Sequence, residues 1–335
     1  MGTLMGGESR QSYAATLPPD RFYCLLDELP LHLIPRHALA ALRAREDPHE
    51  ALFLNPDCIS CSGGELPDEL VSQKQLLSGF VLQAPIVWVR DSVSATLLPF
   101  WLGRQLEATL RGLRVNEVAP ATLSKEMCSR LAAAGILVSA DHAARRQQEW
   151  EDAVRVAAPR FREKGYAPLA NLIHPFHIAA LRRYYRHLIR IGKIQLGDGQ
   201  SPRRYVAYNE PVARFFHRQI VARLSAVAGE PLKASYVYMA SYLSGAELKK
   251  HTDREQCEFS VTLCLDFSPE PALETPWPIR LDTPGGTVTV QQALGDGLVY
   301  RGTRVPHYRN VLGEGRTSTS IFFHYVPADF AGSLD

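Results

Sequence analysis

The strictest pattern in this chain is a two-residue alternation over residues 259–267. It places apolar side chains at every odd position and smaller or polar ones between them: Phe259, Val261, Leu263, Leu265 and Phe267 against Ser260, Thr262, Cys264 and Asp266. A period of two is that of a β-strand, in which successive side chains point to opposite faces. The segment therefore predicts a strand with one face on a hydrophobic core.

Further strands and two helices are expected around this segment. Tyr236, Tyr238 and Tyr242 share one face of a strand at 234–243. More strands are predicted at 286–291, 297–301, 304–310 and 317–326, with Gly and Pro between them. Two helices precede them, at 176–190 after Pro175 and at 211–228 before Gly229. This order indicates an α+β fold whose core is a closed or double-sheet β structure of the jelly-roll kind.

The first half of the chain has a different pattern. Residues 1–160 are predicted to form a mainly helical accessory domain, and 161–335 the β domain with its flanking helices. Helices are expected at 36–45, 97–112, 123–138 with Ser124 as N-cap, and 141–163, and loops at 54–68 and 113–121. The helix at 123–138 could close a helix-turn-helix module, but a plain helical subdomain is the simpler interpretation.

Composition narrows the function classes. The chain has 335 residues and a net charge of +2, with no long basic block, so nucleic acid is not an expected partner. The arginines near 180–190 and at 203–204 are interpreted as a solvated helix face and a solvated loop. No apolar run is long enough to span a bilayer, and Met1–Arg10 lacks the features of a secretory signal. A soluble cytoplasmic protein with no membrane partner is the expectation.

The cysteines also indicate a cytoplasmic protein without disulfides. Six cysteines in a chain of this length do not form a disulfide framework. Cys58 and Cys61 form one C-x-x-C pair without a second pair at zinc-site spacing. Chance spacing in a loop is the preferred interpretation.

A small set of residues carries the chemistry. His251 and Asp253 are two positions apart, which in extended backbone directs both side chains to one face, and His307 follows on a later predicted strand. Two histidines and one carboxylate bind one face of Fe(II) and leave the opposite face open, as in non-haem iron oxygenases. His-x-Asp alone is also compatible with a surface turn, so its weight depends on what surrounds it.

The surrounding motifs appear in a specific order. Tyr242-x-x-Gly245, His251-x-Asp253, His307 and Arg316-x-Ser318 together resemble the Fe(II)/2-oxoglutarate dioxygenase superfamily, in particular its prolyl-hydroxylase-like branch, over about 165–335. The resemblance implies a double-stranded β-helix core with Fe(II) held by His251, Asp253 and His307. It also implies 2-oxoglutarate anchored by Arg316 with Ser318 and assisted by Tyr242, O₂ as oxidant, and ascorbate as a candidate stimulant.

The implied activity is hydroxylation of an unactivated C–H bond in an amino acid, peptide or natural product, with release of succinate and CO₂. Asp253 argues against halogenation, because halogenating relatives lack this carboxylate. Desaturation, epoxidation or cyclisation at the same iron centre is an alternative, and a non-catalytic β-helix binding module is an alternative of another class. A homodimer is left open.

Several neighbours have a structural and a functional interpretation. Arg309 lies two residues after His307 and is expected to face the same cavity, with a substrate-binding and a structural role both left open. The remaining expectations are structural: an Arg254–Glu258 pair across a turn, Trp277 packing a loop, His324 as a core or rim histidine, and His174 and His177 as cap and surface residues.

Overall fold

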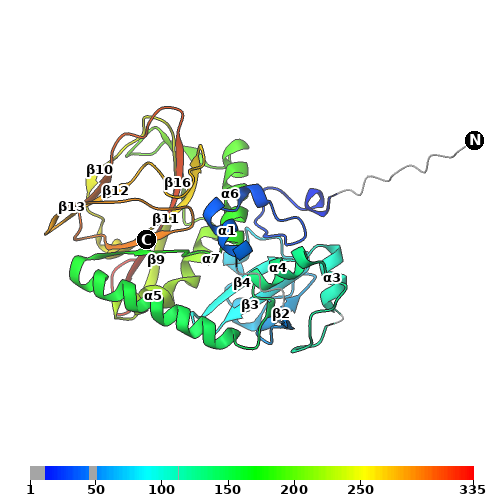
Figure 1. Ribbon diagram of the computed structural model, residues 1–335. Helices are drawn as coiled ribbons and strands as arrows, with labels where there is room; N and C mark the ends of the chain where they lie inside the picture. Colours follow the sequence, from blue (N-terminus) through cyan, green and yellow to red (C-terminus); the bar gives the residue numbers. More distant parts are fainter. Residues whose placement is uncertain (1–11, 45–50, 112) are drawn as a thin grey trace, which may run out of the picture.

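The computed structural model describes residues 12–44, 51–111 and 113–335, which form two lobes (Figure 1). The N-terminal lobe, blue to cyan, contains α1 (Arg36–Ala44), α2 (Asp68–Val71), α3 (Arg104–Arg111), α4 (Lys125–Ala133), β1 (Phe53–Leu54), β2 (Cys58–Cys61), β3 (Ile86–Asp91), β4 (Thr96–Trp101) and β5 (Leu137–Val138). The long helix α5 (His142–Lys164) runs along both lobes. Arg146 at its start forms an ion pair with Asp91 of β3, and its end packs against β6.

The C-terminal lobe carries the remaining elements. Its helices are α6 (Pro175–Arg190), α7 (Pro211–Gln219) and α8 (Val221–Ala228). Its strands are β6 (Tyr166–Leu169), β7 (Gln195–Leu196), β8 (Arg204–Tyr208), β9 (Leu232–Tyr242), β10 (Leu248–His251), β11 (Phe259–Ser268), β12 (Ile279–Thr283), β13 (Gly286–Val290), β14 (Gly297–Arg301), β15 (His307–Arg309) and β16 (Thr317–Pro327). The protein is thus a mixed α/β structure with many antiparallel strands.

The N-terminal lobe corrects the expectation of a mainly helical region. Strands β2, β3 and β4 form an antiparallel sheet in which Ile86 pairs with Trp101. The helix expected at 97–112 begins only at Arg104, because 96–101 pairs with β3 instead, and β2 lies inside the loop expected at 54–68. Apolar residues of both strands pack into the lobe's core, which favours a sheet over a helix here. The expected helix 36–45 is present to Ala44; residue 45 lies outside the described residues.

The other helices agree more closely with the sequence. Ser124 caps α4, since its Oγ accepts a hydrogen bond from the N–H of Met127 at 3.2 Å. Helices α5 and α6 have nearly their expected bounds, with Pro175 in the first turn of α6. The single helix expected at 211–228 is two helices, divided at Ile220.

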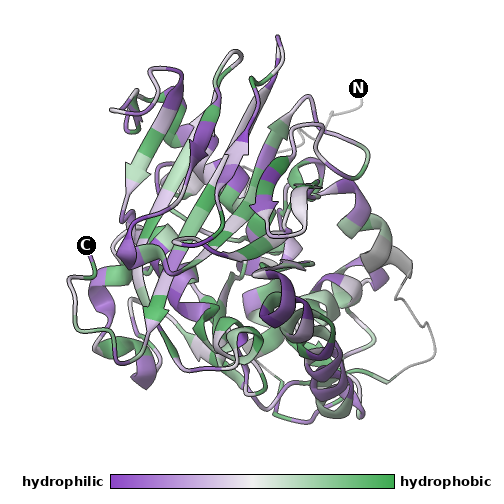
Figure 2. Cartoon of the chain, turned by 90° about the vertical axis from the view of Figure 1, so that its left-hand side faces the viewer, coloured by the Kyte–Doolittle hydropathy of each residue, from purple (hydrophilic) through white to green (hydrophobic). Residues whose placement is uncertain are grey.

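Two antiparallel sheets position the site. The larger has the order β6-β14-β11-β16-β9-β8-β7, and the smaller has the order β10-β15-β12-β13. Hydrophobic and hydrophilic residues alternate along many of these strands (Figure 2). Between β9 and β16 the chain passes repeatedly from one sheet to the other, so residues from distant segments meet between the sheets.

Strand β11 shows how this interior is built. Phe259, Val261, Leu263 and Leu265 pack into the large core, so the opposite face, with Ser260, points between the sheets rather than into solvent. A register shift between Cys264 and Asp266 reverses the facing at the end of the strand. As a result Phe267 joins the cluster between the sheets, against the expected alternation.

One hydrophobic core runs through both lobes, and α6 lies at their junction. His177 of α6 is fully buried, with Nε2 2.9 Å from the Pro99 carbonyl oxygen of β4. The expectation of a surface residue was wrong for His177, because the N-terminal lobe covers this face of the helix. His174 is a cap as expected: its Nδ1 accepts the N–H of Phe176 at 3.1 Å.

These buried histidines predict acid sensitivity. Burial lowers the pKa of His177 to about 3 and that of His174 to about 4. Below the unfolded-state pKa of about 6.5, the unfolded chain binds protons that the folded protein does not. The free energy of unfolding should therefore be highest above pH ~6.5. As the pH is lowered below that value, it should decrease by about 1.4 kcal/mol per pH unit for each histidine. Urea unfolding between pH 7 and pH 5 would measure this slope.

The variant His177→Asn provides the control, because its side chain stays neutral over this range. Its slope should be shallower than that of the unmodified protein. Equal slopes for the two proteins would contradict the assignment of His177.

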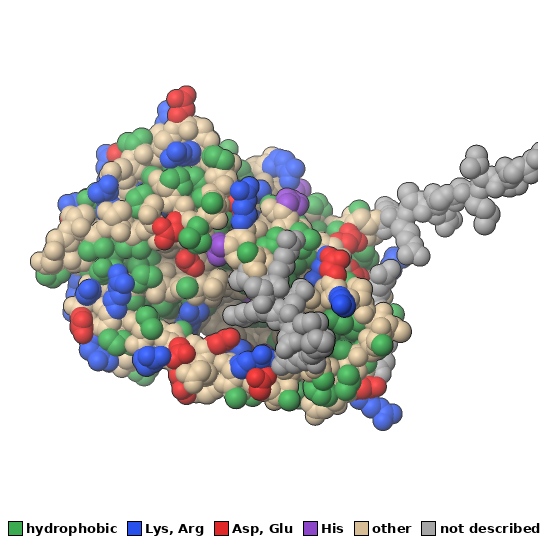
Figure 3. Space-filling view, viewed as in Figure 1, with side chains coloured by type: hydrophobic (Ala, Val, Ile, Leu, Met, Phe, Trp, Pro, Cys, Tyr) green, Lys and Arg blue, Asp and Glu red, His purple; other side chains and the backbone are tan. Residues whose placement is uncertain are grey.

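Surface charge has no single-sign concentration on the face drawn in Figure 3, where acidic and basic side chains are interspersed. Within the described ranges, none of the helices has both the length and the apolar character needed to cross a bilayer.

Candidate metal centre and active site

Strand pairing brings the two expected histidine ligands together. His251 ends β10, His307 begins β15, and these residues are direct partners in the antiparallel ladder. Their ring centroids are 4.3 Å apart. Asp253 follows in the loop after β10, where its backbone N–H donates to the Gly302 carbonyl at 2.9 Å. The three side chains therefore converge at the opening between the sheets.

The donor atoms are spaced as a metal site requires. Asp253 Oδ1 lies 3.6 Å from Nε2 of His251 and 3.6 Å from Nε2 of His307. The ligand atoms of all three residues lie within 4.8 Å of one another. Such spacing can accommodate one cation at about 2.0–2.2 Å from each donor.

The other polar atom of each residue is already occupied. Nδ1 of His251 lies 2.7 Å from the Lys249 carbonyl, and Nδ1 of His307 lies 3.1 Å from the Val305 carbonyl. Each Nδ1–H can donate to its carbonyl, which leaves the Nε2 lone pair for a metal. Burial lowers the pKa of His307, against the opposing charge of Asp253, and so favours the neutral imidazole that a metal needs.

Asp253 is oriented by a hydrogen-bond chain. Ser260 of β11 donates to Asp253 Oδ2 at 2.6 Å, which leaves Oδ1 directed at the histidines. Nδ1 of His324 lies 3.0 Å from the same Ser260 hydroxyl and can donate to it. His324 is thus a buried histidine, and burial lowers its pKa to about 4. It acts on Asp253 through Ser260.

A second possible ligand group combines Asp253 with Cys257 and His324. In this group the Cys257 sulfur lies 3.0 Å from the Tyr236 hydroxyl, and His324 Nδ1 lies 3.0 Å from the Ser260 hydroxyl, so both atoms already have a partner. In the first group, both Nε2 atoms and Asp253 Oδ1 are directed at one another. The first group, with two imidazoles and a carboxylate, is therefore the better metal site.

Replacing Ser260 by alanine should weaken metal binding by about 10–100-fold, because Asp253 loses the partner that orients it. Calorimetric titration with Mn(II) would measure the change. Ser241→Ala is the matched control, since this buried hydroxyl bonds to Thr319 instead. Unaltered Mn(II) affinity in Ser260→Ala would show that the hydrogen bond does not position the ligand.

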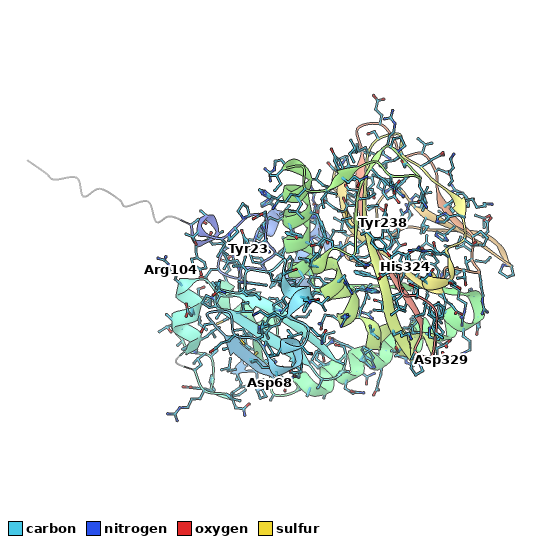
Figure 4. All side chains as sticks on the ribbon, turned by 180° about the vertical axis from the view of Figure 1, so that it is seen from behind. Tyr23, Asp68, Arg104, Tyr238, His324 and Asp329 are labelled. Carbon is cyan, nitrogen blue, oxygen red and sulfur yellow. The ribbon has the colours of Figure 1, made fainter. Side chains whose placement is uncertain are left out.

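A cavity of about 480 Å³ opens beside the three ligands. Tyr238 on β9 and His324 on β16, labelled in Figure 4, come from neighbouring strands of one sheet, and both line it. Its other lining residues include Asp198, Arg204, Tyr208, Tyr236, Tyr242, Leu248, Arg254, Tyr300 and Phe322. Aromatic walls with a few polar groups are typical of small-molecule sites.

No protein-family model matches the chain, and no curated protein matches its sequence. Among solved structures it is similar to the α-ketoglutarate-dependent epimerase SnoN from nogalamycin biosynthesis, at 16% identity over 53% of this chain and 84% of SnoN, TM-score 0.44. A Pseudomonas putida prolyl-4-hydroxylase matches at 18% identity over 51% of this chain and 98% of its own, TM-score 0.41. HygX from Streptomyces hygroscopicus, with nickel and 2-oxoglutarate bound, matches at 13% identity over 52% and 88%, TM-score 0.42.

The sequence resemblance implies co-substrate binding by Tyr242, Arg316 and Ser318. Tyr242 lines the cavity, and its hydroxyl accepts a hydrogen bond from Arg204 at 3.2 Å. Ser318 is buried opposite Tyr242 in the sheet. Arg316 precedes β16 and is not among the residues that line the cavity.

Sequence reasoning missed some residues of this site and misassigned others. Two arginines interpreted as solvated are buried: Arg182 of α6 is 1% exposed and bonds to Asp266 at 2.9 Å, and Arg204 is 3% exposed and bonds to Asp198 at 2.5 Å. The expected Arg254–Glu258 pair is wrong: Arg254 donates to the Tyr236 hydroxyl at 3.2 Å, while Glu258 faces Arg301 at 3.6 Å. The tyrosine periodicity of β9 was the one sequence signal that pointed to the partners of Arg204 and Arg254.

Trp277 is buried as expected, though its ring packs on Tyr242, with centroids 5.1 Å apart, in the cluster between the sheets. Its Nε1–H donates to the Asn310 carbonyl at 2.6 Å. This contact ties the segment before β12 to the segment after β15. Cys58 and Cys61 are free cysteines on β2, in the N-terminal lobe.

Proposed function

We propose that this chain is an Fe(II)- and 2-oxoglutarate-dependent dioxygenase. The observation that carries the proposal is the convergence of His251, Asp253 and His307, each with its second polar atom bonded elsewhere. Two imidazoles and one carboxylate on a single face suit non-haem iron, because the remaining positions stay open for co-substrate and O₂. The donor set thus fits the metal that the sequence resemblance implies.

The strand order supports the proposed double-stranded β-helix. Strands β14-β11-β16-β9 form the middle of one sheet, and β10-β15-β12-β13 form the other. The eight strands from β9 to β16 thereby fill two four-stranded layers, as in a jelly roll. In this arrangement the ligands lie where β10 and β15 meet at the cavity, and 161–335 would be the oxygenase domain beside the accessory region 1–160.

Each group of residues would have a distinct role in this activity. His251, Asp253 and His307 hold the metal, and Ser260 with His324 keep the carboxylate turned toward it. Bound Fe(II) supplies the coupling of O₂ reduction to 2-oxoglutarate decarboxylation, with succinate and CO₂ released and a C–H bond oxidised. The tyrosines of β9 limit the access of water to the cavity and provide flat surfaces against which a substrate can pack.

We propose hydroxylation as the outcome, with Asp253 filling a metal position that a halogenase would leave for halide. Desaturation, epoxidation or cyclisation would need the same ligands and a different placement of substrate. A cavity of about 480 Å³ is in the range that accommodates a drug-sized molecule or one amino-acid side chain of a peptide. A small molecule or a single side chain of a peptide is therefore the proposed substrate.

The test is formation of succinate from 2-oxoglutarate. The protein is loaded with Fe(II) without oxygen, then supplied with 2-oxoglutarate, ascorbate and O₂, and succinate is quantified together with bound iron. Slow succinate formation that depends on iron is expected even without the substrate. A protein that binds neither Fe(II) nor Mn(II) would be the non-catalytic binding module instead.

A further inference from the structure

Arg309 is a buried cation without an acidic partner in the described part of the chain. Its side chain donates to the Trp277 carbonyl and to Gln292 Oε1, the latter at 3.2 Å. Its Nε has no hydrogen-bond partner there, although the residue is only 4% exposed. Buried charges are normally paired, because removal from water is costly. This guanidinium therefore lacks the anion that its burial calls for.

The position of Arg309 relates it to the metal site. His307 and Arg309 are both buried on β15 while Tyr308 between them is only half-buried, so both face the space between the sheets. Alternate residues of a strand are roughly 6.8 Å apart. A five-carbon dicarboxylate is long enough to reach from one position to the other. The Arg309 guanidinium also lies over Trp277, 4.9 Å from its ring centroid, and Trp277 packs on the cavity residue Tyr242.

Two other arginines near the site are less suited to bind an anion. Arg204 lines the cavity, but Asp198 already neutralises it through contacts at 2.5 and 3.0 Å. Neither Arg309 nor Arg316 is among the residues that line the cavity. Arg309 shares the buried face of β15 with His307, whereas the Arg316 side chain passes along Gly313 in the turn before β16. Its backbone N–H is held by Ser244 Oγ at 3.1 Å, which fixes the turn in this position.

We propose that Arg309, rather than Arg316, binds the distal carboxylate of 2-oxoglutarate. The inference rests on the proposed function, and it departs from the position that the sequence resemblance implies. The second carboxylate of the keto acid would supply the missing anion, and the open Nε provides a donor that the protein itself leaves unused.

The test compares two ligands that differ only in this carboxylate. Mn(II)-loaded protein is titrated calorimetrically with 2-oxoglutarate and with 2-oxopentanoate, which has the same chain length and no distal carboxylate. The unmodified protein should prefer 2-oxoglutarate by about tenfold to a hundredfold, the range for a charged hydrogen bond. Arg309→Met should lose this preference and keep its affinity for 2-oxopentanoate. Arg316→Met should keep the preference, and Arg309→Lys should retain part of it.

Each outcome bears on a distinct claim. Equal losses for both ligands in Arg309→Met, with Arg309→Lys unchanged, would mean that Arg309 only supports the fold and would overturn the inference. Loss of the preference in Arg316→Met alone would do the same. If the unmodified, metal-loaded protein bound neither keto acid, the proposed function itself would fail. Mn(II) affinity and melting temperature, measured on every variant, separate misfolding from loss of a contact.

Discussion

Replacing His307 by alanine should reduce iron-dependent succinate formation by more than about a hundredfold. Loss of an outer partner of a metal ligand already costs about 10–100-fold, and loss of the ligand itself should cost more. The His307 ring also packs on Tyr300, with ring centroids 4.6 Å apart, so alanine would leave an unfilled space beside Tyr300. Bound iron and succinate would be measured together, and both should fall.

The control for this prediction is His32→Ala. His32 is exposed in the N-terminal lobe, so the same substitution removes an imidazole without touching the metal site. Melting temperatures of both variants would separate loss of metal from loss of fold. A folded His307→Ala protein with full turnover would show that the three ligands are wrongly assigned.

The largest loss of stability is expected for Arg182→Met. Arg182 is 1% exposed and joins three segments: its Nε bonds to Asp266 at 2.9 Å, and its other nitrogens bond to Glu270 at 2.7 Å and to the Leu33 carbonyl at 2.6 Å. Its removal would leave Glu270 without this cation and Asp266 with Arg186 alone, and loss of one member of a buried ion pair typically costs about 3–5 kcal/mol. Denaturant unfolding at pH 7 would measure the change in the free energy of unfolding.

Arg186→Met is the matched control, because Arg186 bonds to the same Asp266 at 2.6 Å from a side chain that is 45% exposed. Exposed ion pairs contribute about 1 kcal/mol or less, so this variant should remain close to the unmodified protein. If both variants lost the same stability, burial of Arg182 would not be the cause.

The parts of the site that follow from local geometry could be predicted from the sequence. His251 and Asp253 share a direction because extended backbone repeats every two residues, and that spacing is visible in any single sequence. The strand around Ser260 was equally visible. Its polar face was assigned no role, however, because sequence does not tell whether such a face meets solvent or a second sheet.

The rest depended on tertiary contacts. The start of the helix predicted at 97–112 is instead strand β4, because this segment pairs with β3. The helical spacing of its apolar residues gave no sign of that pairing. The side of the sheet to which Phe267 points depends on a register shift, which the periodicity of the sequence does not predict. Arg204 and Arg254 donate to the hydroxyls of Tyr242 and Tyr236 on β9, contacts that depend on how distant segments meet.

The bond between His177 and Pro99, and that between Arg182 and Leu33, have a practical meaning for anyone who wants to isolate residues 161–335. Cutting the chain near position 160 would divide α5 and leave an apolar face of α6 exposed to water. His177 would lose the Pro99 carbonyl, and Arg182 would lose the Leu33 carbonyl while keeping Asp266 and Glu270. The N-terminal half covers one face of the C-terminal half and is part of its hydrophobic core, so it is not a separable domain. Shortened versions should accordingly be trimmed from the ends of the polypeptide and not at its middle.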